Sequence, residues 1–183
     1  MARPPGDFAD PAFLERMRRD ACAGGSAVAC RDLGLEAQSG ANGAPPRLVE
    51  AKVAFERACG LGDGWSCLTA GLMHERGQGT PRDFAQAASF FAKSCDVRYP
   101  SGCQYLGDEY AHGEGVPKDE ARGRALYAEA AGLHDKACDA GDNYSCQALG
   151  TMYRDGLGVP IDLPRAVRLK ERACRGGLRE ACP

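Results

Sequence analysis

CQALGTMYRDGLGVPIDLPRA, residues 146–166, carries a complete set of signals for two helices joined by a short turn. The first helix would begin near the cysteine and end at Gly156, because glycine readily takes the left-handed conformation that closes many helices. Asp162 then stands where an N-cap side chain accepts a backbone N–H from the first turn of the next helix. The stretch therefore predicts one pair of helices.

The same arrangement occurs three more times, beginning at Cys30, Cys67 and Cys103. One glycine recurs inside the first helix of every copy, although glycine in a helix interior costs about 1 kcal/mol relative to alanine. Because glycine has no Cβ atom, we expect a neighbouring helix to approach closely at these positions. The packing glycines are Gly34, Gly71, Gly107 and Gly150. The glycines expected to end the first helix are Gly40, Gly77, Gly113 and Gly156.

The second helix of each copy has its own start signal and an apolar stripe. Its expected N-cap residues are Asp83, Asp119 and Asp162, with Arg47 at the same place in the first copy. The first copy should therefore start its second helix less sharply. Apolar side chains at i, i+3, i+4 and i+7 then predict one buried face. In the second copy these are Phe84, Ala87, Ala88 and Phe91.

Ten cysteines form five pairs with the same C-x7-C spacing. Each pair would join the end of one copy's second helix to the first turn of the next copy, where two Cα atoms can approach within about 4.4–6.8 Å. Such a disulfide would contribute roughly 2–3 kcal/mol. Zinc binding is disfavoured because C-x2-4-C is absent, and a redox role because C-x-x-C is absent. The expected pairs are Cys22–Cys30, Cys59–Cys67, Cys95–Cys103, Cys138–Cys146 and Cys174–Cys182.

Composition limits the classes of function. The 183 residues carry a net charge of −2 at pH 7, which gives no indication of nucleic-acid binding. No run approaches the roughly 18 apolar residues of a transmembrane helix. The first twenty residues contain no apolar segment of the kind found in signal peptides, although disulfides require an oxidising compartment. A mature or trimmed chain, another export route and reduced thiols stay open, with oxidised pairs preferred.

The repeats predict a single solenoid over residues 10–183, preceded by an extended or disordered segment at 1–9. Its parts are a helix at 10–24, units at about 26–62, 63–98, 99–141 and 142–177, and a C-terminal stub at 178–183. The third unit contains seven extra residues, placed at 132–138, which is close to two helical turns. We expect a longer helix there that protrudes, with a kink at Gly132.

The pattern C-x2-LG-x-MY-x2-G-x-GV-x2-D-x3-A resembles the Sel1-like repeat over about residues 10–182. His74 and Ala37 depart from it where tyrosine is usual, and Gly123 where alanine is usual. The C-x7-C pairs are similar to those of the cysteine-rich Hcp-type subgroup, in which they are disulfides. The resemblance implies an all-α fold: an α/α solenoid of about four helix-pair repeats plus flanking half-repeats, clamped by five disulfides.

The resemblance also implies a function. Sel1-like proteins are mostly adaptors, so we expect a monomeric scaffold that binds a protein or peptide in the periplasm or outside the cell. One alternative is an Hcp-like protein that binds or slowly hydrolyses a β-lactam or a peptidoglycan-derived ligand. Another is an assembly factor of the mitochondrial intermembrane space, because a related cysteine-rich group resides there.

Motifs for catalysis are missing from the sequence. The chain has no S-x-x-K, S-D-N or K-T-G of a serine β-lactamase, and no H-x-H or H-E-x-x-H of a metal site. The G-x-G segments follow helices rather than strands, which favours turns over phosphate loops. We therefore expect no catalytic residue, no metal ligand and no cofactor.

The first helix of each copy would line one side of the array. Six polar or aromatic side chains on the last two of these helices are the candidates for a binding groove. They are Tyr105, Asp108, His112, Gln147, Thr151 and Arg154. Trp65, Tyr99 and Tyr144 lie in or beside connectors and are further candidates for contact with a partner.

Overall fold

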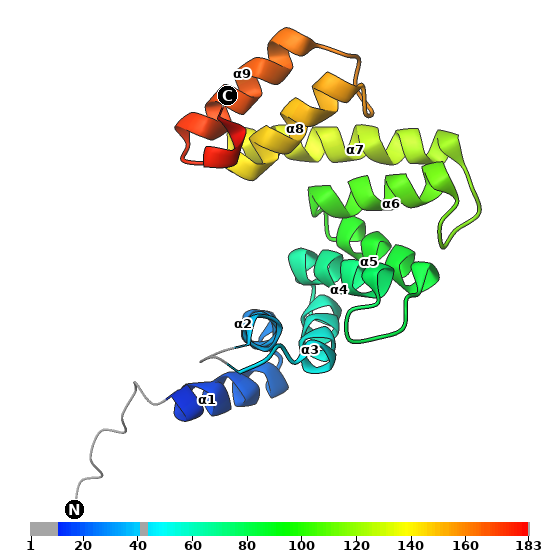
Figure 1. The fold of residues 1–183 in the computed structure, drawn as a ribbon. Helices are drawn as coiled ribbons and strands as arrows, with labels where there is room; N and C mark the ends of the chain where they lie inside the picture. Colours follow the sequence, from blue (N-terminus) through cyan, green and yellow to red (C-terminus); the bar gives the residue numbers. More distant parts are fainter. Residues whose placement is uncertain (1–10, 41–43, 183) are drawn as a thin grey trace, which may run out of the picture. The chain divides into compact units, whose positions relative to one another are not determined.

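The computed structural model describes residues 11–40 and 44–182, and the regular elements in this part of the chain are helices (Figure 1). Segment 1–9 and Asp10 lie outside the described residues. The helices are α1 (Pro11–Ala23), α2 (Ala27–Ser39), α3 (Leu48–Gly60), α4 (Gly64–Arg76), α5 (Phe84–Asp96), α6 (Pro100–His112), α7 (Glu120–Asp139), α8 (Asn143–Asp155), α9 (Leu163–Arg175) and a final 3-10 turn (Arg179–Ala181). The expected all-α class and helix pairs are confirmed.

The expected helix boundaries are formed by the residues that predicted them. Asp83, Asp119 and Asp162 each accept a backbone N–H from three residues further on, at 2.8–3.0 Å. Arg47, at the start of α3, makes no side-chain capping bond to the described residues, as its charge and length lead one to expect. The residues after α2, α4, α6 and α8 are left-handed glycines with φ of 68–78°.

Three other helix starts were missed by the sequence analysis. Ser26, Asp63 and Asp142 cap α2, α4 and α8 through hydrogen bonds of 2.8–3.2 Å from backbone N–H groups. These helices begin about three residues before the cysteine on which the copies were aligned. The capping residues therefore lie in the segment between the two cysteines of each pair, which the sequence predicts to be a connector.

All five expected disulfides are present, and none of the ten cysteines is free. Their Cα–Cα distances of 4.5–4.9 Å agree with the range that the junction between antiparallel helices allows. The first four bridges each link the last turn of one helix to the first turn of the next, so the junctions between successive pairs are covalently closed. The fifth, Cys174–Cys182, ties the end of α9 to the residue after the final 3-10 turn.

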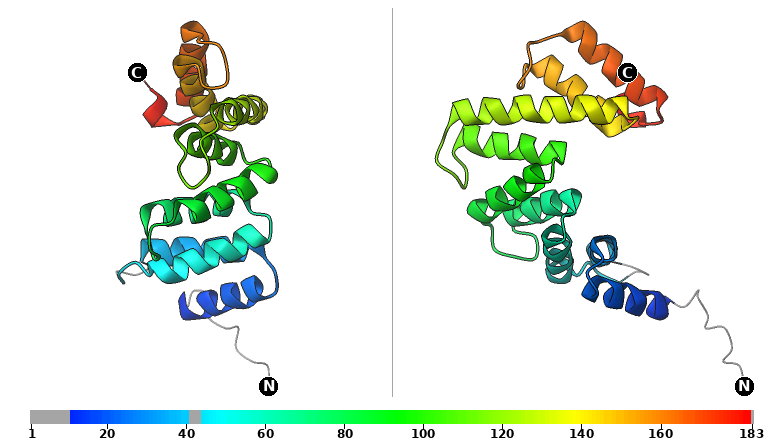
Figure 2. Two further views of the ribbon diagram at one scale, coloured as in Figure 1. Left: turned by 90° about the vertical axis from the view of Figure 1, so that its right-hand side faces the viewer. Right: turned by 180° about the vertical axis from the view of Figure 1, so that it is seen from behind.

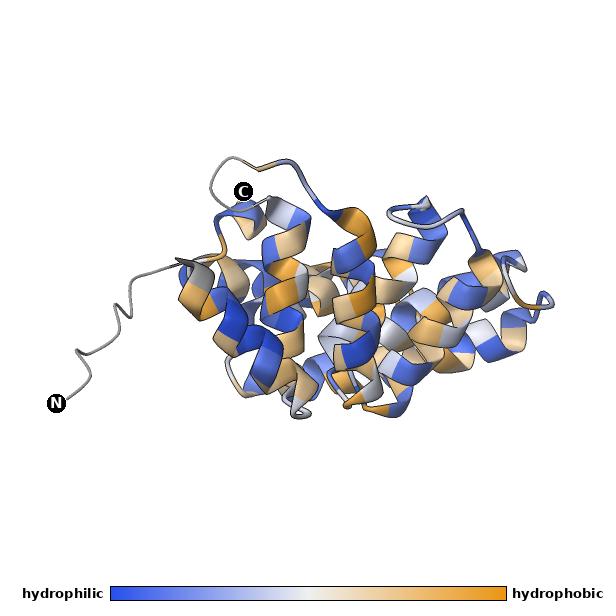
Figure 3. Cartoon of the chain, turned by 90° about the horizontal axis from the view of Figure 1, so that it is seen from below, coloured by the Kyte–Doolittle hydropathy of each residue, from blue (hydrophilic) through white to orange (hydrophobic). Residues whose placement is uncertain are grey.

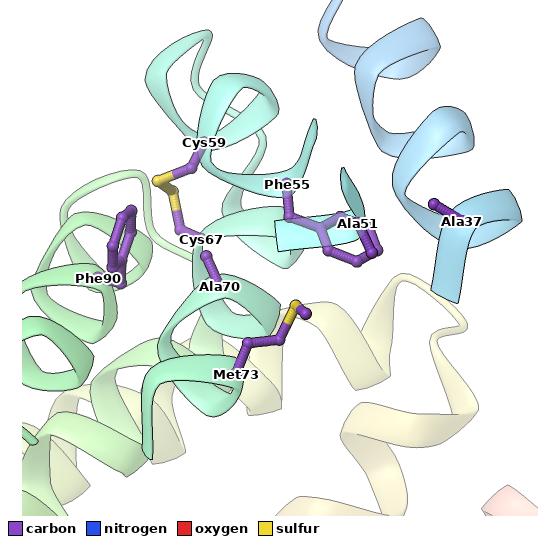
Figure 4. Packing of buried hydrophobic residues seen from close by; sticks show 8 residues of the cluster. All are labelled: Ala37, Ala51, Phe55, Cys59, Cys67, Ala70, Met73 and Phe90. Atoms are coloured by element: carbon purple, nitrogen blue, oxygen red, sulfur yellow. A yellow bond between two sulfur atoms is a disulfide. The ribbon is translucent and has the colours of Figure 1, made fainter. Parts of the chain in front are cut away.

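The contacts divide the chain into two compact units, Met1–Phe90 and Phe91–Pro183, here called unit 1 and unit 2. In unit 1 the core is built around Phe55, which is fully buried (Figure 4). Its ring meets the Trp65 ring edge-on at 5.6 Å. A Cβ atom on Gly34 would lie 2.4 Å from the same ring, so α2 can approach α3 this closely only at a glycine.

In unit 2 the helices α6, α7, α8 and α9 follow one another as neighbours (Figure 2). Helix α7 has 20 residues where the equivalent helices have 13, and it runs through Gly132 without a break. Helix α6 packs on the first half of α7, since a Cβ on Gly107 of α6 would lie 2.8 Å from the Tyr127 ring of α7. The turn after α8 meets the backbone of Tyr127 at Gly158.

The expectation that this longer helix protrudes is wrong. The added turns carry Ala131, Leu133 and His134, and all three are buried. The reason is that α8 is bonded to the end of α7 by Cys138–Cys146 and packs back along it. The two added turns therefore lie beneath α8 rather than in solvent.

Hydrophobic and hydrophilic residues alternate in bands along the helices, as amphipathic packing requires (Figure 3). Several large apolar side chains stay exposed, among them Val49 and Val53 on α3 and Val167 on α9. Among the described helices, none combines the length and the apolar character needed to cross a membrane.

Candidate binding site

A hollow of about 540 Å³ lies in unit 2 where the start of α6, the end of α7 and the first half of α8 meet. We call it the α6–α8 hollow. Tyrosine rings, amides, hydroxyls and a single carboxylate line it, with no lysine or arginine. The lining residues are Tyr99, Pro100, Ser101, Gln104, His134, Ala137, Asp142, Tyr144, Ser145, Gln147, Ala148 and Thr151.

Two of the six predicted groove residues line this hollow. Gln147 and Thr151 lie one turn apart on α8, and the Thr151 hydroxyl donates to the Gln147 carbonyl oxygen at 3.3 Å. Tyr99 and Tyr144, which the sequence marked as contact candidates, also line it, and Tyr144 is 69% exposed. An exposed aromatic ring beside a polar hollow is typical of surfaces that bind a partner.

The other four predicted groove residues make contacts elsewhere. The Tyr105 ring packs on Phe91, with centroids 5.2 Å apart. Asp108 accepts a hydrogen bond of 2.6 Å from the Tyr127 hydroxyl, and burial raises its pKa above the usual range. These contacts hold α6 to its neighbours.

His112 and Arg154 are exposed at the far ends of their helices. The Nδ1 atom of His112 lies 2.8 Å from the carbonyl oxygen of Asp108, one turn earlier in α6. The Arg154 guanidinium pairs with the Asp155 carboxylate next to it at 2.7 Å. The structure therefore does not bring the six predicted residues together as one groove.

A chain of three side chains that sequence reasoning missed forms one wall of the hollow. The Ser145 hydroxyl donates to the Asp142 carboxylate at 2.6 Å. Its oxygen is then free to accept, and His134 Nδ1 lies 3.1 Å away. Because the serine proton is used on the aspartate, His134 Nδ1 must carry the donated proton and Nε2 keeps its lone pair.

His134 is held neutral at physiological pH. Burial lowers the pKa of His134 to about 4, an effect that the Asp142 charge opposes. Only 3% of the residue is exposed, and Nε2 has no hydrogen-bond partner among the residues that the structure describes. A buried acceptor without a partner costs free energy, so such a group calls for an explanation.

The order of these groups differs from that of a hydrolytic triad. In a Ser–His–Asp triad the histidine takes the serine proton and the aspartate orients the histidine. Here Ser145 stands between the other two, donates to Asp142 and accepts from His134. The arrangement fixes the imidazole as a hydrogen-bond acceptor and does not activate the serine oxygen as a nucleophile.

A signal for His134 exists in the sequence. His134 lies four residues before Cys138, and Phe55 and Phe91 lie four residues before their own cysteines. A histidine therefore stands where two other copies have a buried core phenylalanine. Metal-binding motifs do not reveal this residue, whereas its position relative to the cysteine does.

Other clusters offer less chemistry. Cys95, Cys103 and Glu129 form the one group of potential metal ligands found among the described residues. The two sulfur atoms are bonded to each other, so neither is available as a thiolate ligand. A second hollow of about 590 Å³ lies among α1, α2 and α3 in unit 1. Its charged side chains are engaged with neighbours: Arg47 pairs with Glu50 at 3.1 Å, and Arg57 donates to the Ala23 carbonyl oxygen at 2.9 Å.

Comparisons with known proteins agree with this architecture. The family model described as Sel1 repeat matches residues 67–97, 100–135 and 143–178, which is more than half of the chain. None of the curated proteins matches the chain.

The solved structures that resemble the chain include a Sel1 repeat protein from Oxalobacter formigenes, with 23% identity and a TM-score of 0.65 over 91% of this chain and 63% of that one. The protective antigen c5321 of uropathogenic Escherichia coli has 24% identity and a TM-score of 0.56 over 90% of this chain and 41% of that one. The chain thus spans less than two thirds of either protein. Helicobacter pylori cysteine rich protein B has 27% identity, with a TM-score of 0.47 over 76% and 96%.

The first two likenesses concern the fold, and the third is too distant in structure to argue from. The three matched repeats, the helix pairs and the disulfide at each junction lead to one conclusion. This chain belongs to the Sel1 repeat family.

Proposed function

We propose that the chain is a non-catalytic scaffold that binds an extended segment of a protein or peptide at the α6–α8 hollow. The observation that carries this proposal is the hollow itself, with its exposed Tyr144 ring, two glutamine amides and the buried His134. Interfaces are commonly centred on aromatic side chains with a few polar groups that fix orientation. The Sel1 repeat family, whose members are mostly adaptors, supports the same reading.

The rigidity of the helix junctions favours a scaffold role. A binding surface that is already ordered spends less free energy on ordering when the partner arrives. In this chain each junction between helix pairs is closed by a disulfide, Cys95–Cys103 before α6 and Cys138–Cys146 before α8. The hollow is therefore walled by helices that are covalently fixed at their starts.

Five disulfides indicate an oxidising compartment. We place the scaffold in the bacterial periplasm or outside the cell, with the mitochondrial intermembrane space as the alternative. The structural relatives from Oxalobacter formigenes and Escherichia coli are bacterial proteins, which favours the first location.

Site-specific photo-crosslinking tests the scaffold role. A photoreactive amino acid at Thr151, inside the hollow, is compared with the same group at the exposed Arg168 of α9. The proposal expects one product from an envelope extract with the Thr151 probe, which excess unlabelled protein competes away and which the Arg168 probe does not give. The scaffold proposal would be refuted if both probes gave the same product, or if excess unlabelled protein did not reduce the Thr151 product.

The Hcp-like alternative is tested with the same protein. Turnover of the β-lactam nitrocefin by the oxidised chain is compared with that by serum albumin. We expect no difference, because Ser145 is not arranged as a nucleophile. Turnover clearly above albumin that a Ser145→Ala variant loses would replace the scaffold proposal by an enzymatic one.

A further inference from the structure

Our inference concerns what the α6–α8 hollow recognises, and it rests on the proposed scaffold function. We propose that the hollow contains a subsite for a neutral hydrogen-bond donor, a primary amide or hydroxyl side chain of an extended peptide, which donates to Nε2 of His134. The inference gives a role to the seven extra residues of the third repeat, since one of them supplies the acceptor.

The acceptor is built by its surroundings. The serine hydroxyl of Ser145 donates to Asp142 at 2.6 Å and so offers only lone pairs to His134 Nδ1 at 3.1 Å. This fixes the tautomer with the proton on Nδ1. The Nε2 lone pair has no partner within the described residues, and the histidine lines the hollow.

Charge excludes an anionic ligand group. The hollow is lined by no lysine or arginine, and its one carboxylate, Asp142, would repel an anion. An incoming carboxylate would also bring a lone pair to the lone pair of Nε2, where neither group holds a proton. A carboxylate or phosphate therefore finds no positively charged side chain in the lining and no donor at Nε2 of His134.

A cationic group is also poorly matched. An ammonium ion taken out of water needs a counter-charge and several acceptors. The Asp142 carboxylate is already engaged, because one oxygen accepts from Ser145 and the other accepts the backbone N–H of Tyr144 at the start of α8. A neutral N–H or O–H group satisfies Nε2 without that desolvation cost.

The rest of the hollow fits a short polar side chain on an extended backbone. Gln104 of α6 and Gln147 of α8 bring amide groups to it from two helices, and Ser101 and Thr151 bring hydroxyls. Tyr144 offers an exposed ring beside them. A volume of about 540 Å³ takes one or two residues of a peptide.

Four small probes of similar size separate the classes of ligand. Acetamide is a neutral donor, acetone has the same shape without an N–H, acetate is an anion and methylammonium is a cation. The chain contains three histidines, so selective ¹⁵N labelling gives three sets of ring signals. The measurement is the ¹⁵N shift of each Nε2 during titration of the oxidised protein at pH 7.

We expect acetamide to move the His134 Nε2 signal in a saturable way, while the other three probes leave it in place. His134→Phe should abolish the saturable shifts at the Gln104 and Thr151 amides, and it should fold because phenylalanine occupies the aligned position in two other repeats. Ser145→Ala, which frees Nδ1, should weaken acetamide binding at least threefold. His112→Phe is the matched control and should leave binding unchanged.

An acetone shift equal to that of acetamide, or a stronger shift with methylammonium or acetate, would overturn the inference. A ¹⁵N spectrum in which the His134 ring carries its proton on Nε2 would also overturn it. These outcomes are separate from failure of the scaffold proposal. A competed crosslink at Thr151 without an acetamide effect refutes only the subsite, and an acetamide effect without a crosslink refutes only the scaffold.

Discussion

Helices α3 and α7 hold the same place in two repeats and differ by seven residues. In α3 one aromatic side chain, Phe55, serves both neighbours: its ring lies against Gly34 of the preceding helix and meets Trp65 of the following one. In α7 two side chains make these contacts instead of one. Tyr127 lies against Gly107 of α6, while His134, seven residues later, faces α8.

Counting along the helices explains this division. Phe55 stands eight residues after the helix start at Arg47 and four before Cys59. In α7, Tyr127 stands eight after Asp119 and His134 four before Cys138. The extra two turns thus duplicate one core position: Tyr127 packs at Gly107 of α6, and His134 bonds to Ser145 of α8. A side chain that packs against one helix instead of two can be polar.

The serine that precedes the second cysteine in two of the pairs, Cys67 and Cys146, shows the consequence. Ser66 in unit 1 and Ser145 in unit 2 are aligned and both buried. The Ser66 hydroxyl has no partner among the described residues, whereas Ser145 bonds to both Asp142 and His134. The longer helix thus turns an ordinary core position into a polar wall.

The largest expected effect is on Phe55. Phe55→Ala removes a fully buried ring that serves two neighbours, and it should cost about 3–5 kcal/mol of unfolding free energy. His134→Ala should cost clearly less, because one neighbour loses its contact. Denaturant unfolding of the oxidised proteins measures both, and equal losses would contradict the division of the core position.

The next effect is a pH dependence that comes from the histidine of α7, since α3 contains no histidine. Burial lowers the pKa of His134 to about 4, while the unfolded chain titrates near 6.5. The unfolded state therefore binds more protons between these values, so stability is fully present above about pH 6.5 and falls as the pH approaches 4, by at most about 3 kcal/mol.

His134→Phe should remove this part of the pH dependence, and His112→Phe should not. Unfolding free energies of the three proteins at pH 7 and pH 4.5 give the answer. An unchanged slope in His134→Phe would mean that His134 is not held neutral by burial.

Disulfides should show where the two repeats are alike. Cys59–Cys67 and Cys138–Cys146 close loops of the same length with Cα–Cα distances of 4.5 and 4.6 Å. Replacing either pair by serine should cost roughly 2–3 kcal/mol on the chain-entropy model. A difference of more than about 1 kcal/mol in chemical unfolding would show that the α7 junction is special in its crosslink as well as its core.

The smallest effect concerns the connector before α6. Gly25, Gly62, Gly141 and Gly177 have positive φ, and Arg98 occupies the same aligned position with φ of 61°. A non-glycine residue there costs roughly 1 kcal/mol. Arg98→Gly should therefore raise stability by up to about 1 kcal/mol. Gly62→Arg is the reverse test and should lower the unfolding free energy. A lower stability in Arg98→Gly, or a higher one in Gly62→Arg, would contradict the account.

Much of the fold could be predicted because its signals are local. Aspartate caps, left-handed glycines and the cysteine spacing each depend on a few neighbouring residues, and Asp83, Gly77 and the pair Cys95–Cys103 are placed as expected. The repeat made these weak signals strong by showing each of them several times.

The site was predicted only in part, because it depends on how helices are displaced relative to one another. Two turns added to α7 change which residues of α6 and α8 meet, and so Gln147 and Thr151 line the hollow while Tyr105 and Asp108 pack elsewhere. The alignment on cysteines also placed the extra residues at 132–138. Removing 128–134 instead leaves Tyr127 four residues before the cysteine, which is the regular pattern.

That deletion tests the central claim, that the longer helix makes the binding hollow, most directly. The measurement is acetamide titration of the oxidised variant lacking residues 128–134, followed at the Gln104 and Thr151 amides. We predict a folded protein with all five disulfides and no saturable acetamide shift. Saturable binding equal to that of the parent, or a variant that fails to form its five disulfides, would contradict the account.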